Sequence, residues 1–168
     1  ATSYVALNEA LNDERTLSQS GGASADDVKA ARVKVDQAWA AYQPLLDAID
    51  VSSFTSAVSN GLGTVQRDVA ETLPQLRADV DGGQLRAVGT GYATLVDDEL
   101  TLFDNLAQEV TNRDVATFVS AYVAIGRTES SLVQEQIDGG SLLSQSDPTV
   151  AGGRSKATLV SQTEVYRA

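Results

Sequence analysis

The sequence predicts an all-α protein, an antiparallel up-and-down helical bundle of about five to six helices. Hydrophobic residues make up 42% of the chain but aromatic residues only 5%, so the core must consist mainly of small aliphatic side chains, which suit closely packed helices. Apolar residues recur with three-and-four spacing in successive segments. Glycine and proline leave short connections between these segments, as in a bundle. A chain of 168 residues can bury one core, so we expect residues 1–168 to form a single domain.

Start and stop signals delimit the helices. Ser24 or Asp26 caps the second segment, and the acidic residues that follow lie where the helix dipole favours them. Pro74 predicts a kink, or a fresh start with the proline in a first turn. Asn60-Gly61 and Asp138-Gly139-Gly140 each mark a helix end. The expected helical segments are residues 2–19, 24–49, 52–59, 64–81, 84–109, 112–137 and 153–168.

The charge of the chain restricts its partners. The formal net charge is -11, which argues against nucleic acid because phosphate contacts need clustered Lys and Arg. An anionic membrane surface would also repel the chain. A small anion stays possible as a ligand, because one buried arginine acts at contact distance while distant carboxylates are screened over roughly 10 Å.

The missing residue types argue against an enzyme. The chain contains no Cys and no His, which removes the thiol nucleophile, the commonest general base and the usual metal ligands. Catalysis would depend on carboxylates such as Glu14, Glu129 and Glu135, which need environments that push their pKa values apart. Di-metal bundles use a Glu-x-x-His motif that this chain cannot form. We therefore predict no catalytic activity, no cofactor and no metal site.

Two helices carry charged or polar residues beside an apolar stripe. At about 100° per residue, Leu7, Leu11 and Ser18 share one face of the first helix, and Glu14 and Arg15 flank that face. In the segment 112–137, a carboxylate and an amide likewise share one face with apolar residues. The residues of that face are Phe118, Tyr122, Ile125, Glu129, Leu132 and Gln136.

An unpaired buried charge costs several kcal/mol, so these groups need partners. Arg15 and Glu129 could pair across two helices, and Gln136 could join them through its amide. Two interpretations stay open. The residues form a structural polar layer that fixes helix register, or they form a ligand site.

The two ends of the sequence suggest that it belongs to a longer protein. The chain has no Met, and its first and last residues continue helical patterns. We expect a fragment of a membrane-anchored chain whose flanking transmembrane segments are absent. No apolar run reaches the roughly 18 residues of a membrane span, and no signal peptide is visible.

Five short motifs follow one another along the chain. They are Leu11-Asn12-Asp13-Glu14-Arg15, Arg32-Val33-Lys34-Val35-Asp36, Leu73-Pro74-Gln75-Leu76-Arg77 with Val80-Asp81, Tyr92 with Leu95-Val96, and Glu129 to Gln136. In this order they resemble the nitrate- and nitrite-sensing domain family. Members of that family are all-helical sensor modules, found outside the membrane in bacterial signalling proteins or attached to RNA-binding antiterminators.

The resemblance implies a ligand site. In the family, a pair of helical bundles brings the arginines of two Glu-Arg motifs together around a small planar oxyanion, which a guanidinium fork matches with bidentate hydrogen bonds. Carried over to this chain, Arg15 is the first ligand-binding residue, and Gln136 stands where the second arginine is expected. Glu14, Glu129 and Ser18 would form the supporting polar layer. The implied ligand is nitrate, nitrite or another small anionic or polar molecule.

The resemblance also implies a biological role. It predicts a non-catalytic, extracytoplasmic, ligand-sensing input domain of a bacterial signal-transduction protein, such as the sensor histidine kinase of a two-component system. Such receptors are membrane-anchored and are expected to form homodimers. The alternative is a non-catalytic helical interaction or dimerisation domain with a structural polar layer and no ligand. An exposed apolar stripe on one helix would favour that alternative.

Overall fold

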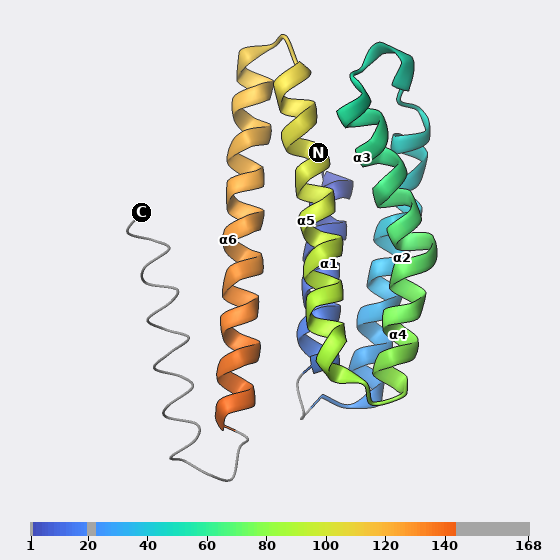
Figure 1. Ribbon diagram of the computed structural model, residues 1–168, viewed down its shortest axis with the longest axis vertical. Helices are drawn as coiled ribbons and strands as arrows, with labels where there is room; N and C mark the ends of the chain where they lie inside the picture. The colour runs from blue at the N-terminus through green and yellow to red at the C-terminus, as the bar shows by residue number, and fades with distance from the viewer. Residues whose placement is uncertain (1, 20–22, 144–168) are drawn as a thin grey trace.

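Helices account for all the regular structure in the part of the chain that the computed structural model describes, residues 2–19 and 23–143. Figure 1 shows the long helices standing side by side, each antiparallel to the one before it. This confirms the predicted all-α bundle. The elements are α1 (Thr2–Gln19), α2 (Ala25–Asp47), the 3-10 turn η1 (Val51–Ser53), α3 (Ser56–Arg67), the π-helical segment η2 (Asp68–Thr72), α4 (Leu73–Asp81), α5 (Leu85–Glu109) and α6 (Arg113–Leu143).

A capping box starts α2. The Ser24 hydroxyl accepts a hydrogen bond from the Asp27 amide (3.1 Å), and the Asp27 carboxylate accepts one from the Ser24 amide (3.2 Å). Each side chain thus satisfies a backbone donor at the open end of the helix. Ser24, rather than Asp26, is therefore the cap of the two that the sequence suggested.

Asn60-Gly61 does not end a helix, which corrects the prediction of a short segment at 52–59. Both residues lie inside α3. A Cβ on Gly61 would lie 3.2 Å from a methyl carbon of Leu102 on α5. Glycine lowers helix propensity by about 1 kcal/mol, but here it allows close packing against α5, and that contact outweighs the local preference.

Pro74 follows an irregular turn rather than a break in the chain. Elements α3, η2 and α4 are continuous in sequence, and Pro74 lies in the first turn of α4, as one of the two sequence-based alternatives predicted. The Leu73 amide bonds to the Asp68 carbonyl, five residues back. Proline lacks an amide hydrogen and cannot continue the normal ladder, so the wider π turn accommodates it. Gly82, with Gly83 at φ 74°, then ends α4.

The core of the bundle lies around α1 and α5. Helix α1 is buried on several sides, against α2, α5 and α6. Glycines allow α5 to approach its neighbours, because a Cβ on Gly91 would lie 2.2 Å from Leu76 Cδ2 and one on Gly126 would lie 2.6 Å from Leu100 Cδ2. None of the helices that the structure describes combines the length and the hydropathy of a membrane span.

Helix α6 packs through a different face from the predicted one. Phe118, Ile125 and Leu132 are 63%, 57% and 58% exposed, whereas Val123 is 2% exposed. The helix also continues through Asp138-Gly139-Gly140 to Leu143, so the predicted helix end at that position is wrong. The helix expected at 153–168 lies outside the described residues.

Candidate functional site

Glu14 is the centre of a buried polar network, which we call the Glu14 network. Its carboxylate is fully buried and accepts two parallel hydrogen bonds from Arg77, Nε to Oε1 and Nη2 to Oε2, each 2.8 Å long. The Tyr92 hydroxyl donates to Oε1 (2.6 Å), and Arg32 Nε lies 3.8 Å from the same oxygen. Both oxygens thus accept hydrogen bonds from within the protein.

Two further carboxylates complete the Glu14 network. Arg77 Nη1 donates to Asp36 (2.8 Å), and Arg32 holds Asp81 with two hydrogen bonds of 3.1 and 2.8 Å. Burial acts to lower the pKa of Arg77, but the hydrogen bonds to Glu14 and Asp36 raise it above the ordinary value. Both arginines therefore stay charged, and α1, α2, α4 and α5 are held in a fixed register.

The Glu14 network explains most of the motifs that carry the family resemblance. Arg32 and Asp36 come from the second motif, Arg77 and Asp81 from the third, and Tyr92 from the fourth. The structure brings their side chains to one place, around Glu14 of the first motif. These motif residues therefore contact one another in the fold, and the partners of Glu14 are Arg77 and Tyr92 rather than the α6 residues that the polar-layer interpretation had placed beside it.

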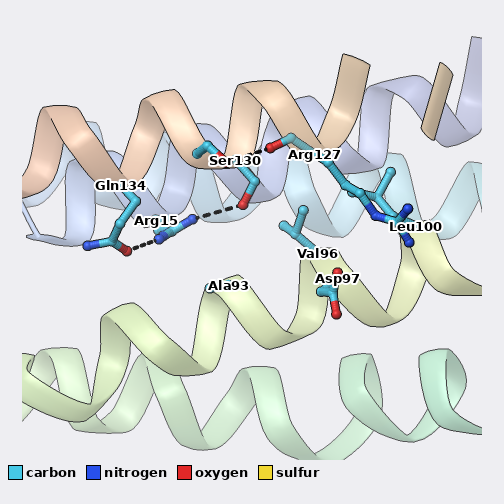
Figure 2. A pocket seen from close by; sticks show the side chains of 9 residues that line it. Arg15, Ala93, Val96, Asp97, Leu100, Arg127, Ser130 and Gln134 are labelled. Carbon is cyan, nitrogen blue, oxygen red and sulfur yellow. Dashed lines mark hydrogen bonds between the residues drawn. The ribbon is translucent and has the colours of Figure 1, made fainter. Parts of the chain in front are cut away.

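Arg15 points to a different side of α1 from Glu14 and lies in a pocket between α1, α5 and α6. Its side chain is 1% exposed. Nη1 donates to Ser130 Oγ (3.3 Å), and Nη2 donates to Gln134 Oε1. Figure 2 shows the guanidinium directed at these two side chains of α6. Both partners are neutral, although Gln134 Nε2 in turn donates to Asp138 Oδ1 (2.8 Å). Among the described residues, Arg15 itself therefore contacts no carboxylate directly.

This cavity, the Arg15 pocket, has a volume of about 410 Å³. Arg127 also lines it, but Figure 2 shows that side chain extending toward Leu100, away from the Arg15 guanidinium. Arg127 Nη2 lies 3.8 Å from Asp104, and its side chain is 49% exposed. The pocket therefore combines a buried cation with a solvated one. Its lining residues are Arg15, Ala93, Val96, Asp97, Leu100, Arg127, Ser130, Ser131 and Gln134.

The electrostatics of Arg15 favour an anion. Burial lowers the pKa of Arg15, and the charge of Asp138 only partly opposes this shift. Its Nε is buried and has no hydrogen-bond partner among the described residues, and no carboxylate there lies within ion-pair distance. Because a buried charge without a counter-charge costs several kcal/mol, an anion in the pocket would stabilise the native state.

The structure does not bring all the predicted site residues together. Gln136 and Glu129 are exposed and do not line the pocket, so the expectation that they face Arg15 is wrong. Gln134 and Ser130 occupy that position instead. Ser18 is buried one turn beyond Glu14. A ligand-binding role for Arg15 stays a prediction at this point.

The apolar pattern of α6 does not indicate Ser130, Gln134 or Arg127, because it predicts a buried face centred on Phe118, which is exposed. At 100° per residue, Gly126, Ser130 and Gln134 lie roughly 80–160° around the helix from Phe118. Gly126 was the available signal, since a glycine inside a helix often marks a close helix contact. Most of the apolar residues of α6 that suggested a buried face are exposed, so the predicted face was wrong.

Together these features describe an all-α domain with an interhelical pocket that presents a buried guanidinium and neutral hydrogen-bonding groups. Among the described residues, no cluster of carboxylates could hold a metal ion. A family model described as nitrate and nitrite sensing matches residues 6–166. The chain therefore belongs to the nitrate and nitrite sensing family and is a sensing domain of the kind that serves signal transduction. No curated protein and no solved structure matches the chain.

Proposed function

We propose that this domain senses a small planar anion, nitrate or nitrite, which binds in the Arg15 pocket. The observation that carries the proposal is the buried Arg15 guanidinium with only neutral partners. Coplanar oxygens of the anion would accept hydrogen bonds from this guanidinium. The hydroxyl of Ser130 can donate a further hydrogen bond to the anion, whereas the Gln134 amide already donates to Asp138 (2.8 Å) and would have to exchange that bond.

The rest of the pocket moderates the affinity. Arg127 adds a second positive charge on the pocket wall, whereas Asp97 adds a negative one. The net charge of -11 also works against an anion. Screening limits that long-range repulsion to roughly 8 Å in physiological salt, so the contact with Arg15 decides binding.

Binding would act on the packing of α6. Both neutral partners of Arg15 lie on α6, while Arg15 lies on α1. An anion that takes hydrogen bonds from Arg15 competes with these contacts, so it shifts the equilibrium between positions of α6. We further propose that the domain is the non-catalytic, extracytoplasmic input of a membrane-anchored receptor such as a histidine kinase. Membrane spans and a kinase in the flanking gene sequence would support this, and their absence would contradict it.

Nitrate is expected to raise the melting temperature of the domain, and Arg15→Gln to abolish the increase. Binding to the native state alone stabilises it by RT ln(1 + [L]/Kd), about 2.7 kcal/mol at 100 times Kd. The measurement is a thermal shift with sodium nitrate or nitrite against sodium chloride at equal ionic strength. Arg113→Gln, an exposed arginine at the start of α6, should leave the increase unchanged.

Ser130→Ala and Gln134→Ala test the same site. Both residues are half-buried, so these substitutions should destabilise the fold less than a substitution of the buried Arg15. Each should weaken the nitrate-dependent shift several-fold without removing it. If no anion shifts the wild type, the sensing proposal for this pocket fails.

Homodimerisation is a second candidate function, favoured by an exposed apolar stripe on α6. We define the α6 stripe as Val115, Phe118, Ile125 and Leu132, which are 45–63% exposed and spaced by three or seven residues. That spacing matches the seam of a coiled coil. If a second copy covers the stripe, sedimentation equilibrium should give twice the monomer mass for the wild type and the monomer mass for Ile125→Lys. A monomeric wild type would contradict this function.

A further inference from the structure

A second buried polar site lies between α5 and the π segment η2, outside the Arg15 pocket. Glu99 and Asp68 are 1% and 8% exposed. One oxygen of each carboxyl group, Glu99 Oε1 and Asp68 Oδ2, is buried without a hydrogen-bond partner among the described residues. Leaving a buried polar atom unsatisfied is costly, so two such atoms at one place indicate a missing partner.

The two carboxyl groups line the same small cavity. Its volume is about 10 Å³, and its other walls are apolar: Leu7, Leu11, Val65, Val69 and Leu95. This volume is close to the minimum that one water molecule needs. A hydrated cation would not fit, and the apolar walls supply no further oxygen ligands. The cavity therefore suits a single water with two polar partners.

The remaining oxygens fix the direction of the hydrogen bonds. Asn8 Nδ2 donates to Glu99 Oε2 (3.4 Å), and the Thr72 hydroxyl donates to Asp68 Oδ1 (3.0 Å). These contacts leave Glu99 Oε1 and Asp68 Oδ2 for the cavity. A protonated Oε1 would donate a hydrogen bond to the water, and the water would donate one to Oδ2, so both of these carboxyl oxygens would have a partner.

We propose that Glu99 and Asp68 form a buried proton-binding site, bridged by one water molecule, which couples the packing of η2 against α5 to pH. Proton uptake is from solvent, and it converts the Glu99 carboxylate to the neutral acid. Two carboxylates that face each other across a small cavity with apolar walls repel each other, so loss of this proton separates η2 from α5. The π turn is the element that can yield, because π segments are irregular and are frequent at functional sites.

The surrounding groups favour the neutral acid. Burial raises the pKa of Glu99 to about 8, and the hydrogen bond from Asn8 opposes this only in part. Burial also raises the pKa of Asp98, and its side-chain hydrogen bond with Asp68 and the charges of Asp68 and Asp97 raise that pKa further. The positive charge of Arg67 acts in the opposite direction and lowers the pKa of Asp98. The groups around the site are Asn8 and Asn12 on α1, Tyr42 on α2, Arg67 on α3, Thr72 in η2, Asp98 on α5 and, beyond Tyr42, Tyr122 on α6.

The expected result is a native state that loses stability as pH rises. The folded Glu99 keeps its proton up to about pH 8, while the unfolded chain releases it near pH 4.5. The native state thus binds more protons in this window, and each pH unit lowers the folding equilibrium constant by up to about tenfold. Urea denaturation of the whole chain between pH 5 and pH 8 measures this. Glu99→Gln, which is neutral at every pH, should remove this component, and Glu71→Gln, an exposed residue of the same π segment, should keep it.

Carbon-13 NMR of the Glu99 carboxyl group tests the site in the wild type, without a variant that must fold. We expect a titration midpoint near pH 8 that moves to lower pH in Asp68→Asn, because the like charge across the cavity is gone. We also expect a cross-peak between a long-lived water and the Val69 or Leu95 methyl groups. A midpoint near 4.5, no response to Asp68→Asn, or no such water would overturn the proposal.

Discussion

Glu14→Gln is expected to lower the free energy of unfolding by about 3–5 kcal/mol, the cost of breaking a buried ion pair from one side. Glu14 accepts two hydrogen bonds from Arg77 and one from Tyr92 in a site with no exposure to solvent. A glutamine amide cannot accept all three, and it leaves the Arg77 charge with only Asp36 as a partner. Urea denaturation gives the change from the transition midpoint, provided that the slope is unchanged.

The adjacent residue provides the matched control. Asp13 forms an ion pair with Lys34 at 3.7 Å, but its side chain is 61% exposed. Exposed pairs contribute at most about 1 kcal/mol, so Asp13→Asn should have little effect. Combining Glu14→Gln with Arg77→Met removes both charges and should recover part of the loss. Equal effects of Asp13→Asn and Glu14→Gln would show that the Glu14 network is not buried as described.

Leu100→Ala is expected to destabilise the domain by about 2–5 kcal/mol, because the substitution leaves a cavity in the contact between α5 and α6. Leu100 is 1% exposed, packs at Gly126 and lines the Arg15 pocket. Since the pocket would be enlarged as well, the nitrate-dependent thermal shift should also decrease. The same denaturation and thermal-shift measurements check both results.

Leu132→Ala is the control for this prediction. Leu132 lies on α6 but is 58% exposed, so its truncation should cost less than about 0.5 kcal/mol. The stability changes of Leu100→Ala and Leu132→Ala therefore show which face of α6 packs against α5. A larger effect at Leu132 than at Leu100 would favour the face that contains Phe118, which the sequence pattern had indicated.

Local signals in the sequence predicted the helices well. Residues 2–19 and 84–109 were expected as helices and correspond to α1 and α5. Ser24, Pro74 and the glycines after Asp81 act as local signals with the predicted effects. Such signals depend on a few neighbouring residues, so they can be read without tertiary contacts.

Long-range packing overrode the local signals at other positions. Asn60-Gly61 stays helical because Gly61 packs against Leu102, more than forty residues away in the sequence. The apolar stripe of α6 suggested a buried face, but α5 contacts a different side of the helix, where Gly126 allows close approach. Periodicity shows which residues share a face, but it does not show which face meets a neighbouring helix.

The sequence by itself determined the fold class, most helix positions and the family, and it identified Glu14 and Arg15 as unusual. Only the tertiary structure decided their different roles. Adjacent residues of a helix point about 100° apart, so Glu14 meets Arg77 and Tyr92 in a satisfied network while Arg15 meets Ser130 and Gln134 in a pocket. Partners this far apart in the chain are set by how the helices pack, and the pattern of one helix does not contain that information.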